Sequence, residues 1–402
     1  MTTTEPGQVE PGRVEPGWLA RGRLARGRVE AGWGEVADAF TANFATAGEV
    51  GANVAVYYRG APVAELWGGV CDLETGAAWE ATTLASYFSL TKGMTATIAH
   101  RLIERGALAP DRPVADYWPE FGANGKAAIT VRMVLAHRAG LVDIPGTFTL
   151  PEVLATAPVV AALAAQRPDW TPGTRHGYHI RSFGWLVGEL IRRQSGLTPG
   201  AAWRQEIADP LALDAWIGLP AHAHARCARL IPPPPGEPTL ADRFGPDSLT
   251  GRAFTGPSGL FHYDEMWRRN DVLSAEIPSS GGVGNASALA RMYAACIGTV
   301  NGVRLLDDAT IAAAAQPQST GPDAVLGVDT TFGLGYMVGA SLPPACGPRA
   351  FGHPGAGGSL AFADPDAGLG FAYVTNRMLP DGRDPRAASL VAAAYRAVAR
   401  QP

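Results

Sequence analysis

Strand signals lie towards both ends of this 402-residue sequence and bracket a long helical region. Near the start, Val54–Tyr58 and Val63–Trp67 are rich in apolar and β-branched residues around a turn at Arg59-Gly60, which is typical of a hairpin. Near the end, three short apolar segments predict further strands: Ala350–Phe351, Ser359–Ala363 and Leu369–Thr375. Neither group has enough strands for a stable sheet of its own. We therefore expect the two groups to pair in one antiparallel sheet.

The middle of the sequence, from about Pro110 to Gly256, consists of helical patterns and loops rich in proline and glycine. We predict an inserted all-helical lobe over residues 111–256, between two parts of an α/β lobe at 31–110 and 257–402. The predicted fold class is α+β, one domain over about residues 33–398 with an antiparallel sheet flanked by helices. Helical spacing of apolar residues predicts helices at Trp33–Thr46, Leu90–Arg105, Pro151–Gln166, Phe183–Ser195 and Pro385–Arg400.

Residues 1–30 repeat Glu-Pro-Gly and then continue with Arg-Gly pairs. Such a composition cannot bury enough apolar surface to fold alone. We expect this segment to be a disordered tail.

Composition excludes several classes of function. The sequence is 47% hydrophobic and 17% charged, with a formal net charge of −4, so it offers no basic field for nucleic acid or an anionic membrane. It begins without a signal-peptide pattern and contains no apolar stretch long enough to span a bilayer. The four cysteines are scattered without a Cys-x-x-Cys pair, which suits a reducing cytosol and argues against a zinc site. We expect a cytoplasmic protein with no metal or cofactor.

Ser89-Leu90-Thr91-Lys92 is the first candidate for chemistry. Ser89 begins the predicted helix, and a lysine three residues later lies on the same face of its first turn. A serine hydroxyl becomes a nucleophile when a base lies within hydrogen-bond reach, and a lysine kept neutral by burial can be that base. The chain has only two lysines among 33 basic residues, and arginine could not give up its proton in this role. The alternative is an N-cap serine followed by a solvated lysine.

Tyr178 is the second candidate, in a loop that leads into the Phe183–Ser195 helix. A phenol held close to an ammonium loses its proton more easily, so Tyr178 could act with Lys92 on the Ser89 proton. The alternative is a packing role at the start of a helix.

The third candidate is the stretch Phe351 to Gly358, in which a strand opens into a glycine-rich turn. Glycine lets the backbone approach a ligand closely, and Gly355 stands at this turn. The backbone amides of Ser89 and Ala356 are candidate donors to a developing oxyanion. His353 could orient the leaving group or stabilise the site. The alternative is a hairpin turn with a solvated histidine.

In this chain order, Ser89-x-x-Lys92, Tyr178 and His353-Pro-Gly355 resemble the motifs of the serine β-lactamase and penicillin-binding protein superfamily. The chain is most similar to its branch of β-lactamase-like carboxylesterases, the family VIII esterases, which resemble class C β-lactamases. The resemblance implies an α/β lobe and a helical lobe with the active site between them. It also implies that Ser89 is the nucleophile and that Lys92 and Tyr178 form the base system, without deciding which of them takes the first proton.

Two departures from the β-lactamase pattern bear on the substrate. The Tyr-x-Asn motif of those enzymes has Ile180 in place of asparagine, and Lys-Thr-Gly is replaced by His353-Pro354-Gly355. Both changes remove polar groups that hold a peptide-like, anionic substrate. They favour a neutral ester or thioester as the small-molecule partner.

The function that we expect is hydrolysis of carboxylic esters with small or short acyl groups, through an acyl-serine intermediate. Alternatives within enzymes are an acyltransferase or thioesterase-type enzyme that passes the acyl group to an alcohol or amine of a secondary metabolite, or a weak β-lactamase or D-amino peptidase. The alternative outside enzymes is a catalytically dead binding protein on the same scaffold. The sequence leaves the natural substrate and the oligomeric state open.

Overall fold

The computed structural model describes residues 25–234, 240–379 and 384–401. Its helices are α2 (Gly34–Thr46), α3 (Leu90–Glu104), α4 (Val131–Leu135), α5 (Leu150–Leu154), α6 (Ala157–Ala165), α7 (Ser182–Ser195), α8 (Pro199–Trp203), α9 (Leu240–Phe244), α10 (Leu249–Thr255), α11 (Asn270–Ser274), α12 (Ala286–Ile297), α13 (Asp308–Ala315) and α14 (Arg386–Val398). Its strands are β1 (Arg26–Val29), β2 (Gly51–Tyr58), β3 (Ala61–Asp72), β4 (Ala77–Ala78), β5 (Ala85–Ser86), β6 (Ala215–Ile217), β7 (Gly282–Gly284), β8 (Ser319–Pro322), β9 (Asp329–Phe332), β10 (Met337–Val338), β11 (Phe351–Pro354), β12 (Leu360–Asp364) and β13 (Leu369–Thr375).

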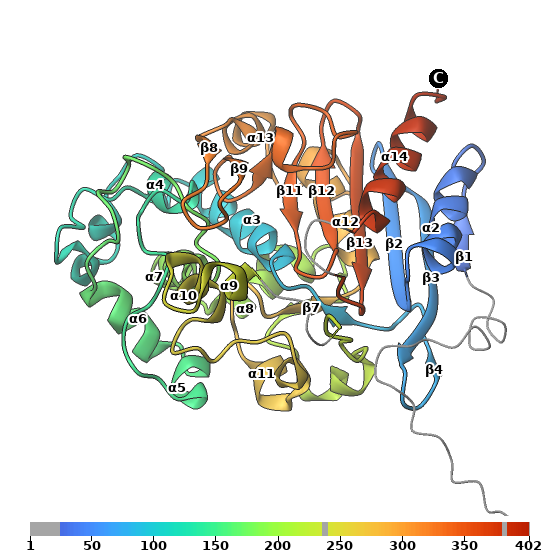
Figure 1. Ribbon diagram of the computed structural model, residues 1–402. Coiled ribbons are helices and arrows are strands. Elements are labelled where there is room, and N and C mark those ends of the chain that lie inside the picture. Colours follow the sequence, from blue (N-terminus) through green and yellow to red (C-terminus); the bar gives the residue numbers. More distant parts are fainter. Residues whose placement is uncertain (1–24, 235–239, 380–383, 402) are drawn as a thin grey trace, which may run out of the picture.

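One antiparallel sheet joins the two groups of strands, as the sequence predicts. Over the described residues it has ten strands in the order β1-β3-β2-β13-β12-β11-β10-β9-β8, with β4 paired to β3. The junction between the two groups is the β2–β13 pair, in register from Tyr58 opposite Leu369 to Ala52 opposite Thr375. Figure 1 shows the blue strands β2 and β3 beside the red strand β13. The predicted fold class, α+β with an antiparallel sheet flanked by helices, is confirmed.

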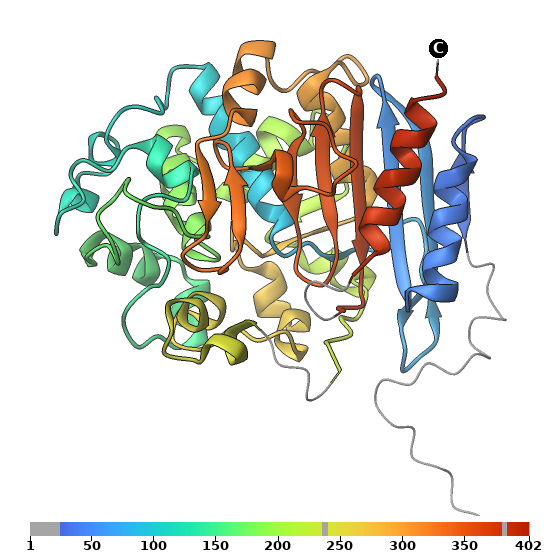
Figure 2. The ribbon, with the colours of Figure 1, turned by 45° about the horizontal axis from the view of Figure 1, so that its top comes forward.

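Helices cover both faces of this sheet. Successive side chains of β13 point to opposite faces, so this strand packs against helices on each side. Leu369, Phe371 and Tyr373 belong to the apolar cluster that includes α2 and α14. The intervening Gly370 lies against α12, where an added Cβ would stand 2.6 Å from the Ala290 carbonyl oxygen. Figures 1 and 2 both show α2 and α14 side by side, although they come from opposite ends of the sequence.

Helix α3 lies between the sheet and the helical lobe, in contact with β11 on one side and with α7 and α8 on the other. Twelve of its residues, from Leu90 to His100 together with Leu102, are buried. A helix that is buried around its whole circumference is a core element rather than a surface helix. Its N-terminal end is therefore held from several directions. A small second sheet, in the order β5-β7-β6, leads the chain into this end.

Three local expectations differ from the structure. The predicted tail extends too far, because Arg26–Val29 form β1 and pair with β3, whereas residues 1–24 lie outside the described residues. The single helix predicted over Pro151–Gln166 is two helices, α5 and α6, because Thr156 between them adopts φ +66° and interrupts the helical backbone. The short strands β8 to β10 were not predicted. Their sequences have no clear strand pattern, and they are strands because they pair with one another and with β11.

None of the helices in the described ranges combines the length and the apolar character that crossing a membrane requires.

Candidate active site

Ser89 stands at the N-terminal end of α3, directly after a strained turn. The preceding residue, Phe88, has φ +47°, a left-handed conformation that residues with a Cβ rarely adopt. Its buried ring packs edge-on against Trp267 and Tyr263, at centroid distances of 5.0 and 5.4 Å. The carbonyl of Tyr87 accepts a hydrogen bond from the amide of Leu90. These contacts fix the sharp turn from β5 into α3 and leave Ser89 partly accessible.

Lys92 lies one helical turn after Ser89 and is completely buried. Its Nζ is 3.2 Å from Ser89 Oγ and donates to the carbonyl of Ser279 at 3.1 Å. No carboxylate of the described residues forms an ion pair with Lys92. Burial lowers the pKa of Lys92 well below its usual value, and the positive charge of Arg181 lowers it further. The amine is therefore suited to being neutral and accepting a proton.

Tyr178 reaches the same serine from the loop before α7. Its hydroxyl donates to Ser89 Oγ at 2.8 Å, and its ring centroid lies 4.7 Å from Lys92 Nζ. The Tyr178 backbone amide donates to Asp323 Oδ1 at 3.0 Å, which holds the loop against β8 and β9. Burial raises the pKa of Tyr178 above its usual value, so the phenol keeps its proton. The expectation that Tyr178 loses its proton more easily is thus not supported; the phenol is a donor to Ser89.

Two neutral histidines fix the loop that carries Tyr178. The amide of Leu141 donates to Nε2 of His179, and the His179 amide donates to Nδ1 of His137, both at 3.1 Å. Burial lowers the pKa of His179 to about 4 and that of His137 well below its usual value. Neutral rings can accept these hydrogen bonds, whereas imidazolium rings could not. The two side chains therefore position Tyr178 without adding charge to the site.

His353 lies at the end of β11, buried against the ring of Tyr178 at a centroid distance of 5.6 Å. Its Nδ1 is 2.7 Å from the Pro354 carbonyl oxygen, and within the described part of the chain its Nε2 has no hydrogen-bond partner. Burial, with the nearby charge of Lys92, lowers the pKa of His353 to about 3. His353 is therefore a neutral wall of the site, and no hydrogen bond joins it to Ser89 in the described structure.

The turn after β11 packs directly against the segment that carries Ser89. A Cβ on Gly355 would stand 2.7 Å from the Tyr87 carbonyl oxygen, so only glycine fits at this contact. Arg386, which is buried and paired with Glu49 at 3.0 Å, donates to the Gly357 carbonyl at 2.9 Å and supports the turn. The structure gives the amides of Ser89 and Ala356 no hydrogen-bond acceptor among the described residues. Both amides are free to bind an oxygen from a ligand.

Arg181 and the Ser279 carbonyl are parts of the site that the sequence analysis missed. Arg181 is buried, donates to the Phe254 carbonyl at 2.6 Å and lies over the Phe261 ring at 4.4 Å. It forms no ion pair with a described carboxylate, and burial lowers its pKa to about 10. Its place three residues after Tyr178, at the start of a helix, is the one signal that could have indicated it. A backbone carbonyl such as that of Ser279 leaves no signal in a sequence.

The structure thus brings Ser89, Lys92 and Tyr178 within hydrogen-bond distance and places His353 and Gly355 against them. Across the described residues, no three histidine, cysteine, aspartate or glutamate side chains gather as metal ligands would. The arrangement can activate a serine hydroxyl with a neutral amine and protonate a leaving group from a phenol or an ammonium.

Comparison with known proteins gives consistent matches. The model of the Beta-lactamase family matches residues 36–396. Esterase/beta-lactamase LipL of Mycobacterium tuberculosis is 37% identical over 361 residues, which cover 86% of this chain and 81% of that protein. The crystal structure of a family VIII carboxylesterase superposes with a TM-score of 0.85 at 33% identity, covering 93% of this chain and 99% of the other. A penicillin-binding protein homologue from Caulobacter crescentus gives a TM-score of 0.83 at 38% identity, with the same coverage.

Proposed function

The chain belongs to the Beta-lactamase family, and on that premise we propose that it hydrolyses neutral carboxylic esters through an acyl-enzyme on Ser89. The observation that carries the proposal is the hydrogen-bonded set formed by the Tyr178 hydroxyl, Ser89 Oγ and the buried amine of Lys92. The family VIII carboxylesterase that shares this fold, and the esterase named among the relatives, support ester hydrolysis as the reaction.

The acylation step is inferred from the short distance between Ser89 Oγ and the buried amine of Lys92, and from the lowered pKa of that amine. Lys92 takes the proton of Ser89, because its amine is kept neutral and its other contact, the Ser279 carbonyl, is an acceptor. The serine oxygen attacks the ester carbonyl, and the new oxyanion receives hydrogen bonds from the amides of Ser89 and Ala356. The bond to the alcohol oxygen then breaks. The departing alkoxide takes a proton from Tyr178, and the phenolate that remains is then reprotonated at the expense of the Lys92 ammonium, so that both groups return to their starting protonation states.

Water completes the reaction by attacking the acyl group on Ser89, with the same amine and phenol as proton carriers. The amine loses its proton to Ser89 when the acid leaves, so the enzyme returns to its starting state. Acyl transfer to an alcohol would use the same residues and differ only in the attacking molecule.

The neutral character of the substrate is inferred from positions 180 and 353. Ile180 is buried and apolar, and His353 is neutral, since its pKa falls to about 3. Ile180 supplies no polar amide for the side-chain amide of a β-lactam, and neutral His353 supplies no cation for its carboxylate. We therefore prefer ester hydrolysis to β-lactam hydrolysis as the proposed reaction.

The test is the Ser89→Ala variant with an activated aryl ester. We expect turnover to fall to the background rate, about a 10⁴-fold loss or more, because the variant has no oxygen to acylate. Intact-mass spectrometry of the wild type with the ester shows the acyl adduct, and peptide mapping places it on Ser89. The products formed with an added alcohol then separate hydrolysis from acyl transfer. Retained turnover in the variant would refute the assignment of Ser89 as the nucleophile.

A further inference from the structure

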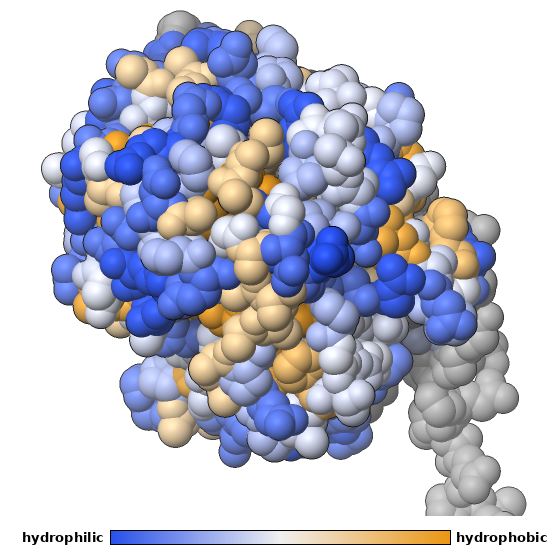
Figure 3. All heavy atoms as spheres, turned by 90° about the vertical axis from the view of Figure 1, so that its left-hand side faces the viewer, coloured by the Kyte–Doolittle hydropathy of each residue, from blue (hydrophilic) through white to orange (hydrophobic). Residues whose placement is uncertain are grey.

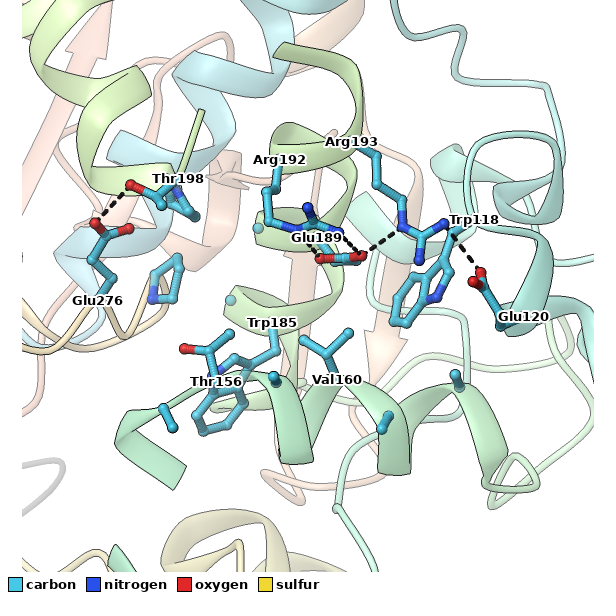
Figure 4. Close-up of a pocket in the computed structure, with 18 of the residues that line it drawn as sticks. Trp118, Glu120, Thr156, Val160, Trp185, Glu189, Arg192, Arg193, Thr198 and Glu276 are labelled. Carbon is cyan, nitrogen blue, oxygen red and sulfur yellow. Dashed lines mark hydrogen bonds and ion pairs between the residues drawn. The ribbon is translucent and has the colours of Figure 1, made fainter. Parts of the chain in front are cut away.

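A second hollow lies in the helical lobe, between α6 and α7. Its volume is about 900 Å³, and its walls come from α6, α7, the turn Pro119–Gly122, Thr198–Pro199 and the segment from Ser274 to Pro278. Ser89, Lys92 and Tyr178 are not among its lining residues. Figure 4 shows Trp185 and Val160 on facing helices of this cavity, with Glu276 to one side, Glu120 to the other, and Glu189 with Arg192 between them. It is therefore distinct from the active site described above.

Small side chains keep the cavity open. On α6, Ala157, Ala161 and Ala164 recur at helical spacing along the wall. The facing side of α7 carries Gly184 and Gly188. A Cβ on Gly188 would lie 3.2 Å from both Pro199 Cγ and Pro278 Cγ, so these glycines already pack closely against the segments behind them. Longer side chains at the alanine positions of α6 would extend into this space.

The charges around the cavity are already paired. On α7, Glu189 binds both Arg192 and Arg193, and towards one end of the cavity Arg193 also binds Glu120. At the other end, Glu276 accepts from the Thr198 hydroxyl at 2.7 Å and from the Gly200 amide at 2.8 Å. Figure 4 shows the arginine–glutamate pairs and the pair of Glu276 with Thr198 as dashed lines. Each charged residue of the wall therefore has a protein partner, and a charged ligand would have to displace one of them.

Apart from these paired groups, most of the wall is apolar. It is formed by the side chains of Trp118, Leu154, Val160, Trp185, Pro199 and Pro278. Figure 3, which faces the helical lobe, shows hydrophobic residues gathered in a band between hydrophilic surfaces. Known small-molecule sites are apolar hollows of about 300 to 1,000 Å³, and this cavity falls within that range.

We propose that this cavity is a second ligand site, which binds a neutral, mainly apolar small molecule. An acyl chain attached to Ser89 is not its occupant, because the Pro278–Ser279 backbone closes the way from the active site. Gly184 packs against that backbone so tightly that a Cβ there would stand 2.4 Å from the Ser279 nitrogen. A membrane or a polar peptide would not match an apolar hollow of this size.

The wall of the cavity is also part of the support of the catalytic amine. Pro278 lines the cavity, its carbonyl accepts from Thr95 Oγ1 at 2.6 Å, and the next carbonyl, of Ser279, accepts from Lys92. A ligand that displaces Pro278 therefore displaces the acceptor that holds Lys92. Occupation of the cavity should change the rate of the reaction on Ser89, a consequence that rests on the proposed function.

Binding is tested with the neutral fluorophore N-phenyl-1-naphthylamine, followed by its own emission. We expect saturable binding at one site, weakened at least about tenfold by Ala161→Trp, which fills the cavity from the exposed side of α6. The matched control is Ala312→Trp, an exposed alanine of α13 outside the cavity, which should bind as the wild type does. Thermal unfolding checks that both variants fold.

The proposed ligand site would be contradicted by the absence of saturable binding to the wild type, or by equal affinity of the wild type and Ala161→Trp. It would also be contradicted by loss of binding after a bulky fluorophosphonate has been attached to Ser89, because that result would place the probe in the active site. Failure of the fluorophosphonate to react would count against the proposed esterase and not against the cavity.

The coupling has its own measurement. At saturating probe, kcat for the aryl ester should change by about twofold or more in the wild type and stay constant in Ala161→Trp. An unchanged kcat in the wild type overturns the coupling.

Discussion

Arg181 is a buried guanidinium whose charge acts on both Lys92 and Tyr178. The Arg181→Gln variant removes that charge. Because Lys92 accepts a proton only when neutral, and a neighbouring cation lowers its pKa, the variant should need a higher pH for the same fraction of neutral amine. We expect the acid limb of the kcat/KM profile to move to higher pH.

The control for this prediction is Arg181→Lys, which keeps a cation at the same position. Its profile should stay close to that of the wild type. If the profile of Arg181→Gln also stays in place, Arg181 is a packing residue of the Phe261 ring and not an electrostatic one.

At the scale of elements, the active site depends on how closely the turn after β11 approaches the start of α3. Gly355→Ala would insert a Cβ 2.7 Å from the Tyr87 carbonyl oxygen, a backbone atom that cannot move without moving Ser89. We expect a loss of about 1 to 3 kcal/mol in stability and a fall in kcat, measured by urea unfolding and by aryl-ester turnover.

Gly34→Ala is the matched control, because a Cβ on Gly34 meets no atom within 4 Å and the residue lies at the start of α2, away from the site. Its kcat and stability should stay near those of the wild type. Equal effects of the two substitutions would contradict the importance of the contact between the turn and α3.

The elements also show what a sequence can predict. β13 was predicted with its observed bounds, Leu369–Thr375, because a continuous apolar run after an Asp-Pro-Asp-Ala-Gly turn suits a central strand. The break at Thr156 was not predicted, since the alanine-rich sequence around it favours a helix and only the fold imposes φ +66°. β1 was missed because Arg-Gly-Arg-Val has no strand pattern without its partner β3.

In the candidate site, too, some features could be predicted from the sequence and others could not. The Ser89 and Lys92 spacing indicated that the two side chains share one helical turn, and the rarity of lysine drew attention to it. The contact with Tyr178 depends on the folding of a loop 89 positions later, so the sequence offered Tyr178 as a candidate but could not fix its hydrogen bond to Ser89. The catalytic roles of these residues stay predictions until the variants are assayed.

On the scale of the whole molecule, buried histidines make stability depend on pH. Burial lowers the pKa values of His100, His137, His179 and His353, to about 4 for His179 and about 3 for His353. In the unfolded chain a histidine binds its proton below about pH 6.5, whereas in the fold these rings stay neutral. Stability is therefore complete above that pH and is lost as the pH falls from about 6.5 towards 4 and 3.

For each histidine that stays neutral in the fold, the loss between about pH 7 and pH 5 should be roughly 2 kcal/mol. Urea unfolding at the two pH values measures it. A urea midpoint that is no lower at pH 5 than at pH 7 would contradict the prediction.

The β2–β13 junction has a further consequence for how the protein is made. A ribosome completes β2 at residue 58 and begins β13 only at residue 369, so the nascent chain carries β2 with one edge open while the whole helical lobe emerges. That open edge is apolar and can pair with strands of other chains. The sheet can therefore be completed only near the end of translation, and until then the open edge of β2 is available to such wrong partners.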